Sequence, residues 1–148
     1  MAIIRKANSF WTGNLQEGKG NLSVESGVLD KTKVSFQQRF ENENGTNPEE
    51  LIGAAHATCF NMVLSKLISG EGLDVKAIQT ENKVYLEKVG EGFSITKIDV
   101  ACEVEAPGLE EEKLRELGEQ AKSDCPVSKA LQGVKFNLSI TLNESVRA

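Results

Sequence analysis

The chain has 148 residues, 39% of them apolar, which predicts one domain over residues 1–148 that is large enough to bury a core. A net charge of −5 without a basic cluster argues against binding to nucleic acid or to an anionic membrane surface. No apolar stretch looks long enough to cross a bilayer, and residues 1–6 lack the apolar core of a signal peptide, so a cytoplasmic protein is expected.

Short strands are predicted at the start of the chain. Residues 3–11 and 20–25 have strand character and are joined by a loop over 13–18. Residues 33–40 then alternate between apolar and polar side chains. Arg39 is therefore predicted to project from the polar face of a strand that adjoins the next helix.

A long helix is predicted over residues 48–69. Asn47 can accept from the free amides of the first turn, Pro48 suits the first helical position, and Glu50 completes a capping-box pattern. The following side chains are apolar or small on almost every side, which is typical of a buried helix. Cys59 lies near its middle.

The second half of the chain alternates strands and helices. Residues 75–89 and 93–105 read as a hairpin, and residues 109–122 as an amphipathic helix. Cys125 would be the N-cap of a short helix that begins with a proline, and residues 134–142 read as a strand with one buried face.

This order of elements predicts an α+β fold. A helix that is apolar nearly all round needs cover on several sides, which six strands of one chain can hardly supply. We therefore expect a second copy of the chain to provide it, giving a homodimer.

Cys59 is the first candidate for chemistry. In the middle of a helix its thiol gains little from the helix dipole, and burial would raise its pKa, so a cation must approach if it is to react. Arg39 is the one arginine of four that is placed near this helix, and its guanidinium could stabilise a thiolate and hold a peroxide oxygen. An ordinary surface charge is the alternative for Arg39.

Glu49 is the candidate carboxylate that would orient Arg39. Ten residues separate Glu49 from Cys59, about 15 Å along a continuous helix, so the two cannot meet within one straight helix. Either the helix is broken after Glu49, or Glu49 serves the Cys59 of the other subunit.

Three further residues have competing interpretations. Cys125, at a helix start, could form a disulfide with an oxidised Cys59, or both could be small core residues. Cys102 falls on an apolar strand face and is expected to be a core residue. His56, one turn before Cys59, could be a base, but a hydrogen-bonded core histidine is the better interpretation. With only one histidine and no C-x-x-C motif, neither a zinc site nor a disulfide framework is expected.

Two separate motifs stand out in the chain. They are Thr46-Asn47-Pro48-Glu49-Glu50-Leu51, which runs into Ala54-Ala55-His56-Ala57-Thr58-Cys59-Phe60, and Cys125-Pro126-Val127-Ser128. Both resemble the osmotically inducible protein C and organic hydroperoxide resistance (OsmC/Ohr) family, and in particular its OsmC branch. The resemblance extends over essentially the whole chain. The Ohr branch takes its arginine from an earlier strand, and this chain has none between Arg5 and Arg39, so Arg39 fits the OsmC branch.

The resemblance implies an intertwined homodimer in which antiparallel sheets wrap around central buried helices, with active sites at the subunit interface. It also implies a thiol peroxidase that uses no metal or flavin and acts in oxidative or osmotic stress defence. By position, Cys59 matches the peroxidatic cysteine, Cys125 the resolving cysteine and Glu49 the active-site glutamate. The expected substrates are organic hydroperoxides, and hydrogen peroxide is a further candidate substrate. The expected reductant is an external, lipoyl-linked dithiol.

Two other functions fit parts of the sequence. A non-catalytic dimeric module that encloses an apolar ligand would keep its function in a Cys59→Ser variant. A thiol–disulfide oxidoreductase acting on proteins is less compatible with a buried Cys59 and the lack of C-x-x-C. Phe40 and Phe60, beside the candidate residues, are compatible with an apolar substrate group.

Overall fold

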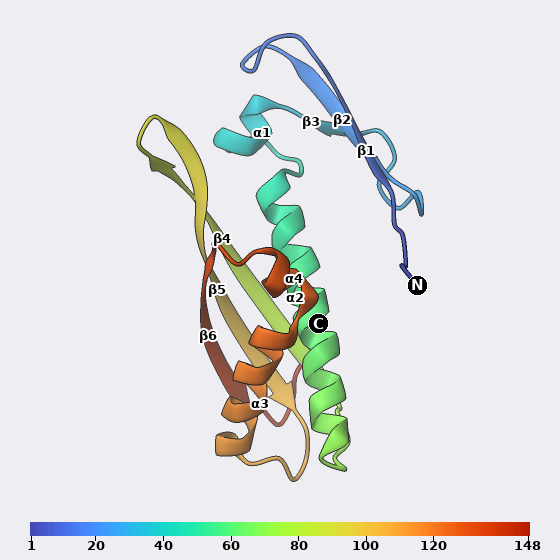
Figure 1. Cartoon of the computed structure of the whole chain (residues 1–148), viewed down its shortest axis with the longest axis vertical. Coiled ribbons are helices and arrows are strands. Elements are labelled where there is room, and N and C mark those ends of the chain that lie inside the picture. Colours follow the sequence, from blue (N-terminus) through green and yellow to red (C-terminus); the bar gives the residue numbers. More distant parts are fainter. The chain divides into compact units, whose positions relative to one another are not determined.

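The computed structural model describes residues 1–148. They form two compact units, Met1–Leu51 and Ile52–Ala148, and the boundary falls within a long helix (Figure 1). The prediction of one domain over residues 1–148 stays a prediction.

The first unit contains a three-stranded antiparallel sheet. Its strands are β1 (Ala7–Thr12), β2 (Lys19–Val24) and β3 (Thr32–Val34), with β2 in the centre. Alternation in residues 33–40 wrongly predicted a longer third strand, because Phe36–Phe40 forms a short helix, α1. Ser35 caps this helix, since its side chain accepts from the backbone N–H of Gln38, a local bond that competes with strand pairing.

The long helix α2 (Pro48–Gly70) begins where the sequence predicts. Asn47 Oδ1 accepts from the backbone N–H of Glu50 at 2.8 Å, and Asn47 Nδ2 contacts the Glu50 carboxylate at 3.5 Å. After the helix, Gly72 has a φ of +79°, a conformation that glycine adopts without strain. The helix is continuous between these two ends.

α2 is long and apolar enough to cross a bilayer by length and composition alone, so the expectation that no stretch has that length is wrong. Only 28% of its most apolar 18-residue stretch is buried within the single chain. Core helices of soluble proteins pass the same test. The exposed positions include Ala54, Ala55, Thr58 and Met62, which form one nearly uncharged strip.

The second unit is built on a mixed sheet. β4 (Ala77–Val89) and β5 (Gly92–Glu105) form the predicted antiparallel hairpin, and β6 (Lys135–Leu142) pairs with β5 in parallel. The expectation of purely antiparallel sheets is therefore wrong for β6. Its parallel direction follows from the connection, because α3 (Glu111–Asp124) and α4 (Pro126–Ala130) return the chain before β6 begins.

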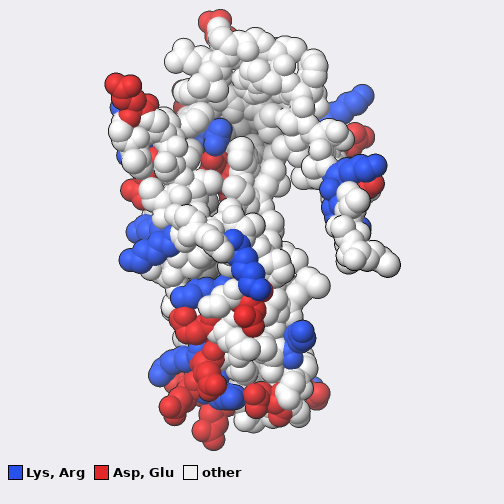
Figure 2. Space-filling view, in the orientation of Figure 1, with Lys and Arg blue, Asp and Glu red and all other residues white.

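Helices α2 and α3 cover one face of this sheet (Figure 1). The buried core between them is contributed by α2, β5 and α3, through Phe60, Leu64, Ile68, Cys102, Val104, Leu114, Leu117 and Ala121. Charged residues gather instead over the end of the unit where α3 lies (Figure 2).

Candidate active site

The structure brings Cys59 and Cys125 into contact although 66 residues separate them in the sequence. Cys59 lies midway along α2, and Cys125 lies between α3 and α4 as the predicted N-cap of α4. The two side chains are hydrogen-bonded to each other, and both thiols are free. Cys125 is fully buried, whereas Cys59 is partly exposed, so Cys59 is the thiol that a small molecule can reach.

The surroundings of Cys59 do not make it a strong nucleophile within its own unit. Burial is the main cause that raises its pKa, and the hydrogen bond with Cys125 raises it further. The backbone N–H of Val127, in the first turn of α4, donates to the sulfur and acts in the opposite direction without reversing the rise. No cationic group contributes to the pKa of this thiol.

The first turn of α4 supports the thiol of Cys59 rather than that of Cys125, its own N-cap residue. A free amide at a helix start favours a nearby thiolate, and here the Val127 amide is bonded to Cys59. Cys125 itself makes no side-chain cap hydrogen bond, although an N-cap side chain can accept from the amides of the first turn. The Val127 N–H of this turn is directed at Cys59 of α2 instead.

Arg39 and Glu49 form a close ion pair in the first unit. Arg39 Nε and Nη2 both donate to Glu49 Oε1, at 3.1 and 2.8 Å. Glu49 is 7% exposed, and the guanidinium carbon of Arg39 also lies 5.2 Å from the centre of the Phe40 ring. Arg39 comes from α1 rather than from the predicted strand, and its remaining donors are left for another acceptor.

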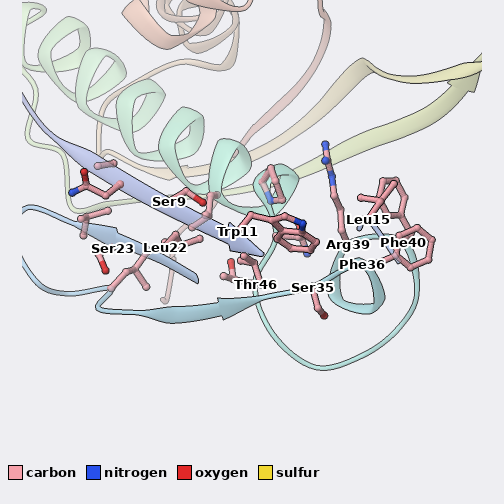
Figure 3. Close-up of a pocket in the computed structure, with 18 residues that line it drawn as sticks. Ser9, Trp11, Leu15, Leu22, Ser23, Ser35, Phe36, Arg39, Phe40 and Thr46 are labelled. Carbon is pink, nitrogen blue, oxygen red and sulfur yellow. The ribbon is translucent and has the colours of Figure 1, made fainter. Parts of the chain in front are cut away.

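Arg39 lines an apolar pocket of about 740 Å³ in the same unit. Figure 3 shows Leu15 beside Phe36 and Phe40, with Trp11 also lining the pocket. Phe40 is thus next to the guanidinium, as the sequence suggested. Phe60 is not available to a substrate, because it is fully buried in the core of the second unit.

The continuity of α2 removes one of the two explanations for how Glu49 could serve Cys59. The helix is not broken after Glu49, so ten residues of regular helix separate the two side chains. The other explanation, that Glu49 serves the Cys59 of a second subunit, stays a prediction.

The other two candidates have the predicted core character. Cys102 is 2% exposed, and burial raises its pKa to about 11. His56 is fully buried and hydrogen-bonded at both ring nitrogens, to Asn82 and Ser128, and burial lowers its pKa. Sequence reasoning missed the two partners of His56. Ser128 follows Cys125 by three residues, and His56 precedes Cys59 by three residues. This equal spacing was the available signal that His56 and Ser128 meet when the two cysteines do.

Comparisons with known proteins agree with the motifs. A family model described as "OsmC-like protein" matches residues 40–139. Peroxiredoxin OsmC of Escherichia coli (strain K12) is 46% identical over 132 residues, which cover 89% of this chain and 92% of the relative. Organic hydroperoxide resistance protein OhrB of Bacillus subtilis (strain 168) is 34% identical over 114 residues, 77% of this chain and 82% of the relative.

A crystal structure of Bacillus subtilis OhrB superposes with a TM-score of 0.69 at 30% identity, covering 92% of this chain and 98% of that one. The fold and the two motifs therefore define an α+β protein of the OsmC and Ohr type. The chain belongs to the OsmC-like family, which confirms the resemblance found in its sequence.

Proposed function

We propose that this protein is a cysteine-based peroxidase that reduces organic hydroperoxides to alcohols in oxidative or osmotic stress defence. The observation that carries this proposal is the contact between Cys59 and Cys125, one partly exposed thiol bonded to one buried thiol. The relatives named Peroxiredoxin OsmC and organic hydroperoxide resistance protein support the same activity.

The reaction proceeds in two steps. The Cys59 thiolate attacks one oxygen of ROOH, the O–O bond breaks, and the alcohol ROH leaves with a proton while the sulfur becomes a sulfenic acid. The Cys125 thiol then condenses with this sulfenic acid to form the Cys59–Cys125 disulfide and release water. An external dithiol, for which a lipoyl-linked group is our candidate, returns the disulfide to two thiols by exchange.

Arg39 supplies the positive charge that the surroundings of Cys59 lack. A guanidinium stays protonated at any working pH, so it can stabilise the thiolate and the oxygen on which charge develops. Glu49 fixes the orientation of that guanidinium through the two hydrogen bonds to Oε1. The apolar pocket beside Arg39 favours substrates with an apolar R group over hydrogen peroxide, the smaller substrate.

The active protein in this proposal is an intertwined homodimer of the cytoplasm. The exposed strip of α2 and the exposed apolar residues of the first unit give a second copy surface to cover. Arg39 and Glu49 of one subunit then serve Cys59 of the other. Mixing Cys59→Ser chains with Glu49→Ala chains would restore part of the activity if this is so, because one site of the mixed dimer has every group.

The decisive experiment adds one equivalent of cumene hydroperoxide to the reduced protein, counts free thiols and maps disulfides by peptide mass spectrometry. We expect loss of two thiols as a Cys59–Cys125 bridge, with Cys102 free and the Cys59→Ser protein inert. Survival of all three thiols would favour the second candidate, a non-catalytic module that holds an apolar ligand in the pocket of the first unit.

A further inference from the structure

A hydrogen-bonded network that contains no thiol lies directly beside the cysteine pair. His56 Nε2 is 2.9 Å from Ser128 Oγ, and His56 Nδ1 is 2.8 Å from Asn82 Nδ2. His56 is fully buried and Ser128 is 8% exposed. The proposed peroxidase chemistry uses neither residue, so the burial of these two polar side chains, with the half-buried Asn82 beside them, needs another explanation.

The protonation state of the histidine follows from its partners. Asn82 Nδ2 also donates to the Gly53 carbonyl oxygen, at 3.1 Å. Because a carbonyl oxygen can only accept, the Asn82 nitrogen rather than its oxygen must face both Gly53 and His56. His56 Nδ1 must then accept from Asn82, and the proton lies on Nε2, which donates to Ser128 Oγ. The ring is neutral and cannot take a second proton without opposing the amide of Asn82, so it does not act as a base.

The ring is also fixed by packing. It stacks on Phe136 of β6 at 4.6 Å between ring centres and on Phe60 of α2 at 6.1 Å, both at 26°. A side chain that is held by stacking on two sides and by hydrogen bonds at both nitrogens has no freedom to turn. Ser128 is therefore bonded to a rigid donor.

The spacing of the residues gives this bond a consequence for the thiols. Cys59 follows His56 by three residues on α2, and Cys125 precedes Ser128 by three residues at the start of α4. Two contacts thus join α2 to the start of α4, which run in opposite directions: Cys59 with Cys125, and His56 with Ser128. The two contacts lie about one helical turn apart. Disulfide formation tolerates little displacement, because the Cα atoms must lie within about 4.4–6.8 Å of each other.

We infer that His56 is a positioning residue for the second step of the reaction: its bond to Ser128 holds α4 in the register in which Cys125 faces Cys59. This inference rests on the proposed peroxidase function. The sulfenic acid of Cys59 has two fates, condensation with Cys125 to a disulfide and water, or reaction with a second ROOH to a sulfinic acid and ROH. His56 favours the first fate without touching either sulfur.

The test measures the ratio of disulfide to sulfinic acid that forms from the Cys59 sulfenic acid. Reduced wild-type, Ser128→Ala and Ser128→Thr proteins are mixed with increasing cumene hydroperoxide, and intact mass spectrometry counts disulfide against sulfinic acid. Stopped-flow trapping of the sulfenic acid with dimedone gives the rate of the first step. Thr80→Val is the matched control, because it also removes a buried hydroxyl bonded to a side chain of α2, Asn61 Oδ1 at 2.6 Å.

We expect Ser128→Ala to raise the sulfinic fraction per turnover by about threefold to tenfold, the factor that one buried hydrogen bond is worth. The rate of the first step should fall by a smaller factor, because the Val127 N–H that supports Cys59 lies in the same turn of α4. Ser128→Thr should keep most of the wild-type partition, and Thr80→Val should not change it. Asn82→Ala, which leaves the His56 proton free to move to Nδ1, should act in the same direction as Ser128→Ala and serves if that variant is poorly folded.

Two results would overturn the inference. One is an unchanged partition in both Ser128→Ala and Asn82→Ala. The other is an equal shift in Thr80→Val, which would mean general loosening of the unit. If the wild-type protein forms neither sulfenic acid nor disulfide, the proposed peroxidase function fails instead, and the two failures are thereby distinguished.

Discussion

The two units of the chain differ in whether they bury large apolar side chains. Every large apolar residue that is fully buried belongs to Ile52–Ala148, where α2 and α3 cover the mixed sheet. In Met1–Leu51 the buried side chains are polar or charged, namely Ser35, Gln38 and Glu49. Phe10 and Leu15 of that unit are 61% and 59% exposed. The second unit has a core of its own, and the first does not.

This difference matches a division of the chemistry. The thiols lie in the unit with a core, where burial brings them together and raises the pKa of Cys59. The ion pair of Arg39 and Glu49 lies in the unit without one. Burial alone can align two sulfurs, but it opposes the thiolate. The proposed enzyme therefore needs a charge from the unit without a buried apolar core.

The largest effect is expected from Arg39→Met, which removes the cation and keeps much of the apolar length. We expect the second-order rate of Cys59 oxidation to fall by about 10²–10³, the scale of losing one oriented donor at a reacting oxygen. The pH dependence of that rate should also move upward, because burial then raises the pKa of Cys59 without a guanidinium to oppose it. Stopped-flow mixing with cumene hydroperoxide over a pH series measures both.

Arg115→Met is the matched control for Arg39→Met. Arg115 lies on α3 with a 70% exposed side chain, and its guanidinium is 3.6 Å from Glu111 at the surface. Its removal should leave the oxidation rate unchanged. Equal rates for the Arg39→Met and wild-type proteins would show that the ion pair of the first unit plays no part in the chemistry of the second.

The next effect tests whether a second copy covers α2. Met62 is 70% exposed on the apolar strip, so Met62→Glu would place an uncompensated charge in the proposed interface. A buried charge without a partner costs about 3–5 kcal/mol, so dimerisation should weaken by at least about 10²-fold. Sedimentation equilibrium of the Met62→Glu protein measures the change.

Gln120→Glu, on the exposed face of α3, adds the same charge at a polar position and should leave the dimer intact. If Met62→Glu and Gln120→Glu proteins have the same mass in solution as wild type, the strip is not an interface. The cover that α2 lacks within the chain would then have to come from something other than a second copy.

A smaller effect is expected on the stability of the second unit at acid pH. Burial lowers the pKa of His56, so below its ordinary value of about 6.5 the unfolded chain binds a proton that the folded chain does not. The stability that depends on neutral His56 is complete above pH 6.5 and is lost as the pH falls from there toward the folded pKa. Each unit of pKa difference corresponds to about 1.4 kcal/mol.

Urea unfolding of the reduced protein between pH 7.5 and 5.5 measures this slope. His56 is the only histidine, so no other side chain of its type contributes to it. His56→Gln should lower stability at pH 7.5 but flatten the dependence on pH. The same slope in both proteins would contradict the assignment.

The sequence predicted most elements because their signals are local. Asn47 and Pro48 mark the start of α2, and the alternation in residues 134–142 marks β6, since capping and period-two burial depend on neighbours in the chain. The third strand was predicted too long because Ser35 caps α1 with a bond that alternation does not reveal. The parallel pairing of β6 with β5 depends on long-range topology and leaves no mark in a short pattern.

The candidate site divides in the same way. Residue type and motif pointed to Cys59, Cys125, Arg39 and Glu49, and the structure brings them together as two pairs. Asn82 was not found, because an asparagine in a strand has no sequence feature that links it to a histidine in a helix. Only tertiary packing creates that contact.

The smallest effect is expected from Cys102→Ala, which separates a core thiol from a reactive one. Cys102 is 2% exposed with a pKa of about 11, so its thiolate is scarce at neutral pH and peroxide cannot reach it. Cys102→Ala should lose about 1 kcal/mol of stability for the small cavity it leaves, and keep the rate of Cys59 oxidation and the yield of disulfide. Cys102→Ser, which buries a hydroxyl, should lose more stability and no activity. A fall in disulfide yield with either variant would mean that the third thiol exchanges with the bridge, and the redox chemistry would then extend into the core that holds the second unit together.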